Sequence, residues 1–526
     1  MKIGINLIPL RPGKNGGMEV YLRNLLEQLF LIDNVNQYYL ITAPYNDSTL
    51  NYSAPNCKKL RIHEGRGLID LTSGLLSKFI PSHTYVDDPM TRIIKDNKID
   101  LWFCPFLSLD PRPLNIPSIV TIPDLQHEYF PDYFSKEELE LRRDYIQPSC
   151  EQATKIITIS QFSKQSFIEK LGIKPEKIEV IYLAAGDNFG KNTDDQKKIL
   201  NKYNLPEYYL LYPANAWPHK NHLNLIKGFN HYKKIYNDSL HLVLTGSDLK
   251  NNIAINDLIS QYNLKESVHI LNYIDKGDMP ELFKNAKALI FPSLFEGFGI
   301  PLLEAMTVGC PVIASDTTSI PEIADNAAYL FEPTDPLSIC DAIHKIVADE
   351  PLREELVSRG KERAILYSYE KVARMHLDLF TSVYNQYKDS NNSLKNECHY
   401  FHGLYSDGWF SKMKFVYCGK KRFRHLHIDL RSELPVKYPM KISIILNDKK
   451  INAIIPSLGI HSFDFEIPDI ETTNTEYKIE IISKYSYSPK KLGINDDERK
   501  ISIILDSLIM IDFNENSTEY VQRKVK

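Results

Sequence analysis

The sequence has few of the features that mark metal-binding, disulfide-linked or membrane-spanning proteins. Its seven cysteines lie far apart and form no C-x-x-C pair, so we predict neither a zinc site nor a disulfide framework. No run reaches the roughly 18 apolar residues that a membrane span needs, and the first residues lack the apolar stretch of a signal peptide. We therefore expect a cytoplasmic protein in a reducing compartment.

The sequence also has no large excess of charge of either sign. The chain carries 63 basic and 67 acidic residues, a net charge of −4, so no nucleic-acid partner is expected. Hydrophobic residues make up 43% of the sequence, which is enough for ordinary cores, and 526 residues predict more than one domain. One apolar, nearly uncharged segment, residues 67–80, predicts either a peripheral contact with the inner face of a membrane or a buried helix.

Strand-like and helical segments alternate through the first two thirds of the chain. The strand-like runs of the first block are residues 2–7, 38–42, 100–104, 118–122, 156–159 and 179–183. After the polar stretch 184–198, the second block has strand-like runs at 208–212, 240–245, 268–271, 288–292, 311–314 and 328–331, and a closing helix at 369–388. This α/β pattern predicts two doubly wound, Rossmann-like domains, residues 1–185 and 186–390, whose strand carboxyl ends face one cleft.

The last part of the chain differs in kind. Short strand-like runs separated by turn residues predict an all-β sandwich over residues 396–515. Its aromatic residues Tyr405, Trp409 and Phe410 could stack on sugar rings, or they could simply form core. The basic run 420–424 could meet phospholipid or a polymer, or be a solvated edge strand protected by charge. The run 488–505 loosely resembles β-sandwich modules appended to bacterial polysaccharide enzymes.

Residues 291–316 (FPSLFEGFGIPLLEAMTVGCPVIASD) carry the strongest functional signal. A strand leads into a glycine loop, and Pro301 suits the first turn of the helix that follows. The free amides of a helix start favour an anion, while Glu296 and Glu304 bracket the loop and suit hydroxyl groups. A diphosphate between two polyols, as in a nucleotide-sugar, fits both. The alternative is an ordinary strand-loop-helix turn in which Glu304 complements the helix dipole.

The whole run resembles the Glu-(seven residues)-Glu signature of retaining GT-B glycosyltransferases, especially the mannosyltransferase-like members of glycosyltransferase family 4. The matching positions are Ser293, Glu296, Gly297, Phe298, Gly299, Pro301, Glu304, Ala305, Gly309 and Pro311, continued by the runs 319–322 and 331–333. The resemblance implies that Glu296 binds donor-sugar hydroxyls and Glu304 the ribose. It also implies that the amides of Phe298, Gly299 and Ile300 face the sugar and phosphate.

The resemblance also implies a chemistry without a bound metal or a protein nucleophile, because the leaving phosphate takes the acceptor proton. No Asp-x-Asp pair of the metal-dependent kind follows a strand in the first half, so no metal cofactor is expected. Lys220, just after the first strand of the second half, would contact the diphosphate. A solvated surface lysine is the alternative. An arginine common in the family is missing, since Ala214, Asn215 and Ala216 stand in that stretch.

In the first half, Gly16 and Gly17 resemble the family's Gly-Gly turn before the first long helix, where a backbone can approach a phosphate closely. A plain tight turn is the alternative. Asp124 matches the Asp of a His-Asp pair in the family, but Pro123 stands where the His would be. His127, three residues on, would either reach the donor sugar or cap a turn.

The sequence therefore predicts a retaining transferase that moves a hexose from a nucleotide-sugar to a glycan, in bacterial surface polysaccharide (O-antigen) assembly. GDP-mannose is the donor suggested by similar enzymes, and a lipid-linked glycan is the expected acceptor. Two other classes stay open. A nucleotide-sugar epimerase of the same fold would isomerise its ligand, and a glycan-binding scaffold would have a degenerate cleft.

Overall fold

The computed structural model describes most of the first 393 residues and the strands that follow them. The described residues are 1–62, 89–112, 114–190, 196–271, 274–393, 398–402, 409–410, 412–419, 423–432, 440–446, 449–457, 459–466, 475–483, 503–512 and 517–522. The apolar segment 67–80, Tyr405, residues 420–422 and the stretch 488–502 lie outside them.

By their contacts the residues divide into two units. One contains Met1–Leu75, Asp100–Leu109 and Ser118–Thr381, and the other contains Leu76–Ile99, Asp110–Pro117 and Ser382–Lys526. Both predicted Rossmann-like halves belong to the first unit, and the strands of the last part of the chain belong to the second.

The N-terminal half is built on a parallel sheet of seven strands in the order β3-β2-β1-β4-β5-β6-β7. The strands are β1 (Lys2–Asn6), β2 (Gln37–Thr42), β3 (Cys57–Arg61), β4 (Leu101–Cys104), β5 (Ser118–Thr121), β6 (Lys155–Thr158) and β7 (Ile178–Val180). Its helices are α1 (Gly16–Ile32), α3 (Gln126–Tyr129), α4 (Lys136–Gln152) and α5 (Gln161–Leu171).

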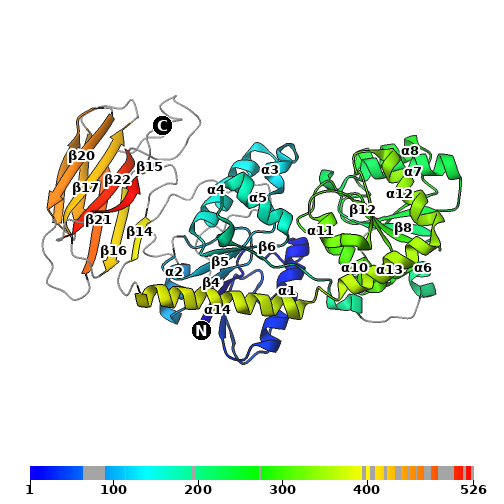
Figure 1. The fold of residues 1–526 in the computed structure, drawn as a ribbon, viewed down its shortest axis with the longest axis horizontal. Helices are drawn as coiled ribbons and strands as arrows, with labels where there is room; N and C mark the ends of the chain where they lie inside the picture. Colours follow the sequence, from blue (N-terminus) through cyan, green and yellow to red (C-terminus); the bar gives the residue numbers. More distant parts are fainter. Residues whose placement is uncertain are drawn as a thin grey trace. The chain divides into compact units, whose positions relative to one another are not determined.

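The C-terminal half repeats this winding with six parallel strands in the order β10-β9-β8-β11-β12-β13. The strands are β8 (Tyr209–Pro213), β9 (His241–Thr245), β10 (Val268–Leu271), β11 (Ala288–Phe291), β12 (Val312–Ser315) and β13 (Tyr329–Phe331). Figure 1 shows helices α7 (His222–Tyr236), α8 (Ile253–Gln261) and α12 (Pro336–Ala348) on one face of this sheet, and α6 (Gln196–Tyr203), α10 (Ile300–Val308) and α13 (Glu350–Ala364) on the other. Two short helices, α9 (Met279–Asn285) and α11 (Ile320–Ala324), complete this half.

In both sheets the strand order reverses between two central neighbours, β1 and β4 in the first sheet and β8 and β11 in the second. Loops that leave the carboxyl ends of such neighbours diverge to opposite faces and open a crevice, which is where open α/β sheets bind ligands. The strand order therefore indicates two pairs of loops as candidate ligand sites. One pair follows β1 and β4, and the other follows β8 and β11.

Helix α14 (Tyr369–Ser393) returns from the C-terminal half and packs on the N-terminal one. His376 is fully buried there, with its Nε2 2.8 Å from the hydroxyl of Tyr21 in α1 and its ring against Phe103 of β4. Its Nδ1 lies 2.8 Å from the carbonyl of Val372, so Nδ1 carries the proton and Nε2 accepts from Tyr21. Burial lowers the pKa of His376 to about 4, which keeps the ring neutral.

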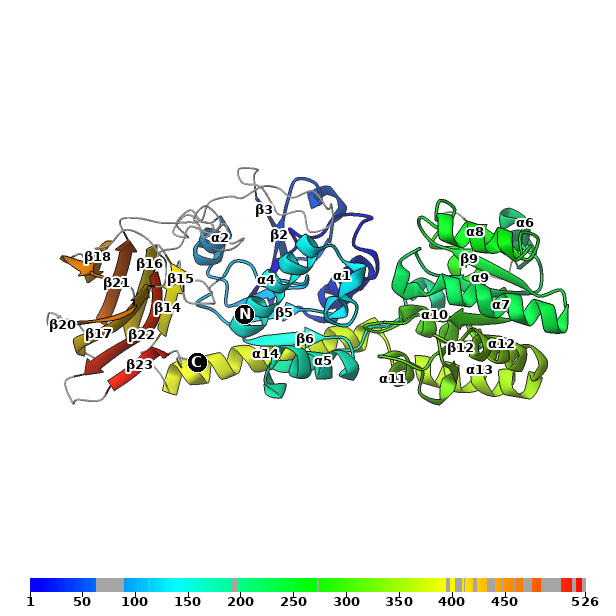
Figure 2. The same cartoon turned by 90° about the horizontal axis from the view of Figure 1, so that it is seen from above.

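The second unit holds α2 (Pro89–Asn97) and two antiparallel five-stranded sheets (Figure 2). One sheet contains β14 (Cys398–His402), β16 (Lys412–Gly419), β21 (Thr475–Ser483), β18 (Met440–Leu446) and β19 (Lys449–Ile455). The other contains β15 (Trp409–Phe410), β22 (Ile503–Asp512), β17 (Phe423–Ser432) and β20 (Gly459–Glu466), with β23 (Ser517–Gln522) paired to β22. Alternate residues of β17 and β18, such as Leu426, Ile428, Ile442 and Ile444, are buried, as expected of strands with one face in a sandwich core.

The predicted fold class is confirmed: two Rossmann-like domains followed by antiparallel β-strands. The predicted domain boundary at residue 185 falls between β7 and β8. In the part of the chain that the structure describes, no helix is both long and apolar enough to cross a bilayer.

Because α14 supplies buried side chains to the N-terminal half, its removal should destabilise that half rather than the one it follows. A chain ending after residue 391 should keep a cooperative thermal transition and protected amides in β4. A chain ending after residue 366 should lose both, since the faces of Tyr21 and Phe103 become exposed. Equal β4 protection in the two truncated chains, measured by hydrogen exchange, would contradict the packing role of α14.

Candidate functional site

The reversal point of the C-terminal sheet brings two opposite charges together. Lys220 closes the short 3₁₀ helix Pro218–Lys220 after β8, and Glu296 lies in the loop after β11. The Lys220 Nζ lies 2.6 Å from the Glu296 Oε1, and the two side chains are only 17% and 11% exposed. The two residues predicted separately for the diphosphate and the sugar thus form one ion pair.

The backbone around Lys220 is fixed by buried polar groups. Tyr212 of β8 donates to the Lys220 carbonyl at 2.7 Å, and the amide of Leu294 donates to the His219 carbonyl at 2.7 Å. Asn221 adopts a left-handed conformation (φ 61°), and its side chain donates to the carbonyls of Pro292 and Pro333. These bonds tie the loop after β8 to the loop after β11, so the lysine is held beside the glutamate.

The backbone of Glu296 is held from the segment after β12. Its amide donates to the Thr318 Oγ at 3.1 Å, and the Ser319 hydroxyl reaches the carbonyls of Glu296 (2.9 Å) and Phe298 (3.2 Å). Thr318 has φ 55°, an unfavourable conformation for a β-branched residue that the surrounding bonds must maintain. Ser319 belongs to the run 319–322 that continues the motif, but the sequence did not show that Thr318 and Ser319 hold the Glu296 backbone, because this contact joins the loops after β11 and β12.

Asp124 comes to this loop from the N-terminal half. A Cβ placed on Gly297 would lie 2.6 Å from an Asp124 carboxylate oxygen, so only glycine fits between them. Burial raises the pKa of Asp124, against the hydrogen bond that it accepts from the Gln126 amide, and the charge of Glu296 adds to the rise. The structure therefore brings Asp124 together with the Lys220–Glu296 pair, as the sequence suggested.

The start of α10 has no side-chain cap. Gly299 stands at its N-cap with φ 99°, so no side chain of its own covers the amides of the first turn. A Cβ on Gly17 would lie 3.5 Å from the Ile300 Cδ1, which places the predicted Gly16–Gly17 turn opposite this helix start. Gly16 itself has φ 53° and begins α1. The Phe298 side chain is buried between Tyr182 and Tyr367, so only its backbone can serve a ligand.

Glu304 lies one turn along α10 from Ile300, and therefore on the same helix face. Burial raises the pKa of its carboxyl to about 7. No hydrogen-bond donor among the described residues pairs with this carboxyl group. A partly buried acid without a protein partner is suited to accept hydroxyl groups from a ligand.

His127 occupies a different environment. It is 2% exposed, with its Nε2 3.6 Å from the Glu128 carboxylate and its ring against Phe134. Burial lowers its pKa to about 4, and the charge of Arg142 acts in the same direction. These contacts all lie within the N-terminal half, so a role for His127 at a donor sugar stays a prediction.

The two halves meet around the Glu296 loop. Phe295 packs against Tyr129, Phe130 and Phe162 of the N-terminal half, with ring centroids 5.5–6.0 Å apart. The Glu322 carboxylate of α11 accepts the first two amides of α5, from Gln161 at 2.7 Å and Phe162 at 3.0 Å. A carboxylate at a helix N-terminus is stabilised both by the amides and by the dipole. We call this contact the Glu322 latch.

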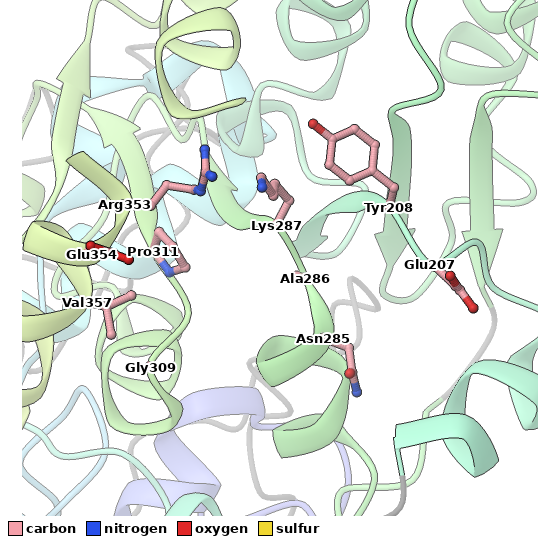
Figure 3. Close-up of a pocket in the computed structure, with 10 residues that line it drawn as sticks. All are labelled: Glu207, Tyr208, Asn285, Ala286, Lys287, Gly309, Pro311, Arg353, Glu354 and Val357. Atoms are coloured by element: carbon pink, nitrogen blue, oxygen red, sulfur yellow. The ribbon is translucent and has the colours of Figure 1, made fainter. Parts of the chain in front are cut away.

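Other places on the first unit do not compete with this site. No group of three His, Cys, Asp or Glu residues suited to a metal ion occurs among the described residues. A cavity of about 320 Å³ lies at the opposite, amino ends of β8, β11 and β12, lined by Tyr208, Lys287 and Arg353 among others (Figure 3). Because α/β ligands bind at carboxyl ends, we assign the candidate active site to the Lys220–Glu296 region.

Comparison with known proteins identifies the two halves of the first unit. The model of Glycosyltransferase Family 4 matches residues 15–184, and that of Glycosyl transferases group 1 matches residues 193–363. O-antigen chain mannosyltransferase B of Escherichia coli is 27% identical over 265 residues, covering 50% of this chain and 70% of that protein. O-antigen chain mannosyltransferase RfbU of Salmonella typhimurium is 29% identical over 263 residues, covering 50% and 69%. The crystal structure of Anabaena HepE in complex with UDP and glucose superposes with a TM-score of 0.55 at 18% identity, over 73% of this chain and 100% of that one.

The raised pKa of Glu304 predicts a pH-dependent stability. A carboxyl whose pKa is higher in the folded state stabilises the fold below pH 4.5, and this contribution is lost as the pH rises to about 7. The glutamine of Glu304→Gln cannot ionise, so the variant should not lose this stability as the pH rises. Its free energy of unfolding should exceed that of the wild type between pH 5 and 8 by at most about 3 kcal/mol. Urea unfolding over this range checks it, with the exposed Glu362→Gln as control. Parallel pH curves for wild type and Glu304→Gln would refute it.

The Glu322 latch predicts a local change in amide exchange. Glu322→Ala should speed exchange at Gln161 and Phe162 by about tenfold or more, because their amides lose an acceptor. The next amide, that of Ser163, donates to the Ser160 hydroxyl within the N-terminal half and should stay protected. Unchanged exchange at Gln161 and Phe162 in Glu322→Ala would mean that the latch is open in solution.

Proposed function

Since the chain is a GT-B glycosyltransferase, with a family 4 domain followed by a group 1 domain, we propose that it is a retaining mannosyltransferase of surface polysaccharide assembly. The observation that carries this proposal is the Lys220–Glu296 pair beside the uncapped start of α10. A cation, the backbone amides at the start of α10 and two nearby carboxylates match the diphosphate and the two polyols of a nucleotide-sugar.

Donor binding would exchange the partners of the ion pair. Lys220 would turn from the Glu296 carboxylate to the donor diphosphate, and Glu296 would accept hydroxyls of the sugar. Each charge is part-buried, so each must find a new partner when the pair opens. This exchange makes the unliganded site stable and the liganded one selective for a molecule that carries both groups.

In the transfer step, the bond between the anomeric carbon and the phosphate oxygen breaks while the bond to the acceptor oxygen forms on the same face. The acceptor hydroxyl proton passes to the leaving phosphate oxygen. Lys220 and the α10 amides would stabilise the charge that develops on that phosphate. Asp124, beside Gly297, would line the donor-sugar side, and Glu304 would hold the ribose hydroxyls of the leaving nucleotide. No metal and no protein nucleophile enters this scheme.

The similar proteins support the choice of substrates. Both O-antigen mannosyltransferases support mannose as the sugar, and GDP-mannose is the corresponding donor. The acceptor we propose is a glycan, in its lipid-linked form, reached from the cytoplasmic side by a peripheral contact with the membrane.

A thermal-shift screen of GDP-mannose, UDP-glucose and other nucleotide-sugars tests the proposal directly, because a bound ligand raises the apparent stability. GDP-mannose should give the largest shift, and the enzyme should slowly hydrolyse it without an acceptor, also in excess chelator. Isomerisation of the sugar would instead indicate an epimerase, and the absence of any turnover would indicate a scaffold.

Lys220→Ala should separate phosphate recognition from base recognition. Because the lysine acts on the diphosphate, this variant should bind the nucleoside diphosphate about 10- to 100-fold more weakly while its affinity for the bare nucleoside stays the same. Calorimetry with both ligands measures this, and Lys227→Ala on α7 serves as control. Equal losses for both ligands would make Lys220 a structural residue only.

A further inference from the structure

The loop after β1 belongs to the reversal point of the N-terminal sheet, opposite the donor residues. It runs from Leu7 to Asn15 and leads into the Gly16–Gly17 turn, where Gly17 approaches Ile300 at the start of α10. The loop therefore precedes, by a few residues in the sequence, the turn that faces the expected position of the donor phosphate. It belongs to the N-terminal half, whereas the donor residues belong to the C-terminal half.

Arg11 in this loop is held in a defined place. Its guanidinium carbon lies 3.7 Å from the ring centroid of Tyr45, so the planar group stacks on the aromatic ring. Tyr45 is fixed in turn, since its hydroxyl donates to the Ile8 carbonyl. Stacking orients the guanidinium without using any of its five N–H donors.

The backbone of the same loop is rigid. The Asn15 side chain accepts the Arg11 amide, and the Glu19 carboxylate accepts the Gly13 amide at 2.7 Å while it pairs with Arg23. The buried Asn46 side chain donates to the carbonyls of Leu7 and Leu10. Arg11 is therefore presented by a braced loop rather than by a mobile one.

The guanidinium itself has no acidic or carbonyl partner among the described residues. Most other arginines of the first unit are paired, for example Arg142 with Glu138 and Arg143 with Glu128. The neighbouring Lys14 is exposed and adds a second positive charge. A stacked, oriented and unpaired guanidinium is the arrangement that binds a phosphate through two parallel hydrogen bonds.

We infer that Arg11 binds a diphosphate group of the acceptor, the group that would join a glycan to its lipid carrier. The donor diphosphate already has Lys220 and the α10 amides in the C-terminal half, which leaves Arg11 in the opposite half for the acceptor. This inference rests on the proposed glycosyl transfer and specifies the class of acceptor: an anionic, phosphate-bearing one rather than a neutral oligosaccharide.

Calorimetry with farnesyl diphosphate, farnesol and inorganic diphosphate tests it, with the donor site saturated by the nucleoside diphosphate. The wild type should bind farnesyl diphosphate more tightly than either other ligand. Arg11→Ala should weaken that binding about 10- to 100-fold, and Arg11→Lys, which keeps the charge but not the fork, should recover only part of it. Arg374→Ala removes an exposed arginine that pairs with Glu370 and serves as the matched control.

Three results would overturn the assignment of Arg11. The first is an unchanged affinity of Arg11→Ala for farnesyl diphosphate, and the second is the same loss in Arg374→Ala. The third is inorganic diphosphate binding as tightly as the lipid form, which would mark a site for a free anion. The thermal unfolding transition should be the same in Arg11→Ala and wild type, which shows that the variant is folded. Absence of donor hydrolysis in the wild type would count against the transferase proposal and not against Arg11.

Discussion

The ion pair between Lys220 and Glu296 depends on the strand order of the C-terminal sheet. Strands β8 and β11 lie some 75 residues apart in the sequence but are neighbours in the sheet. The loops that follow them meet for this reason. Lysine and glutamate are mostly exposed residues, and their partial burial here is tolerated because each neutralises the other. Tyr212, Asn221, Thr318 and Ser319 then serve to hold these two charges at one distance.

The loop that carries Glu296 contacts both halves of the protein. Phe295 packs into an aromatic cluster of the N-terminal half, Gly297 lies against Asp124, and Ser319, which holds the Glu296 carbonyl, leads into the helix of the Glu322 latch. Any separation of the halves must therefore move the residues that hold Glu296. Because the same few contacts hold Glu296 and join the halves, a ligand that stabilises this arrangement of Glu296 would also favour association of the halves.

Much of the fold could be predicted because its strands are apolar, short and separated by helices. Strand β3 was not predicted, since its sequence CKKLR has charged residues at an edge position and no apolar run. Among the late strands, the isoleucine-rich β18 was predicted, whereas β14, the two-residue β15, β19 and the polar β23 were not. These strands are specified by pairing with neighbours rather than by their own pattern.

The features of the candidate site likewise fall into two groups: those that a local motif indicates and those that depend on tertiary contacts. Lys220, Glu296 and Glu304 could be named as candidates because each lies in a local motif, and the structure places Asp124 beside Gly297. Their roles stay predictions. The pairing of Lys220 with Glu296 could not be read from either residue, nor could the neutral, buried state of His127, because both depend on distant segments. The sequence did not indicate Arg11 either, because the tyrosine on which its guanidinium stacks is 34 positions away in the chain.

The return of α14 to the first half also has a consequence for synthesis on the ribosome. Chains emerge from the amino end, and domains generally fold as they appear. Here the partner of Tyr21 and Phe103 is His376, so more than two thirds of the chain must be translated before the first sheet is covered. Until then the nascent N-terminal half exposes an apolar face, and the C-terminal half, whose helices are all local, can complete its own core first. The order of maturation is thus the reverse of the order of synthesis.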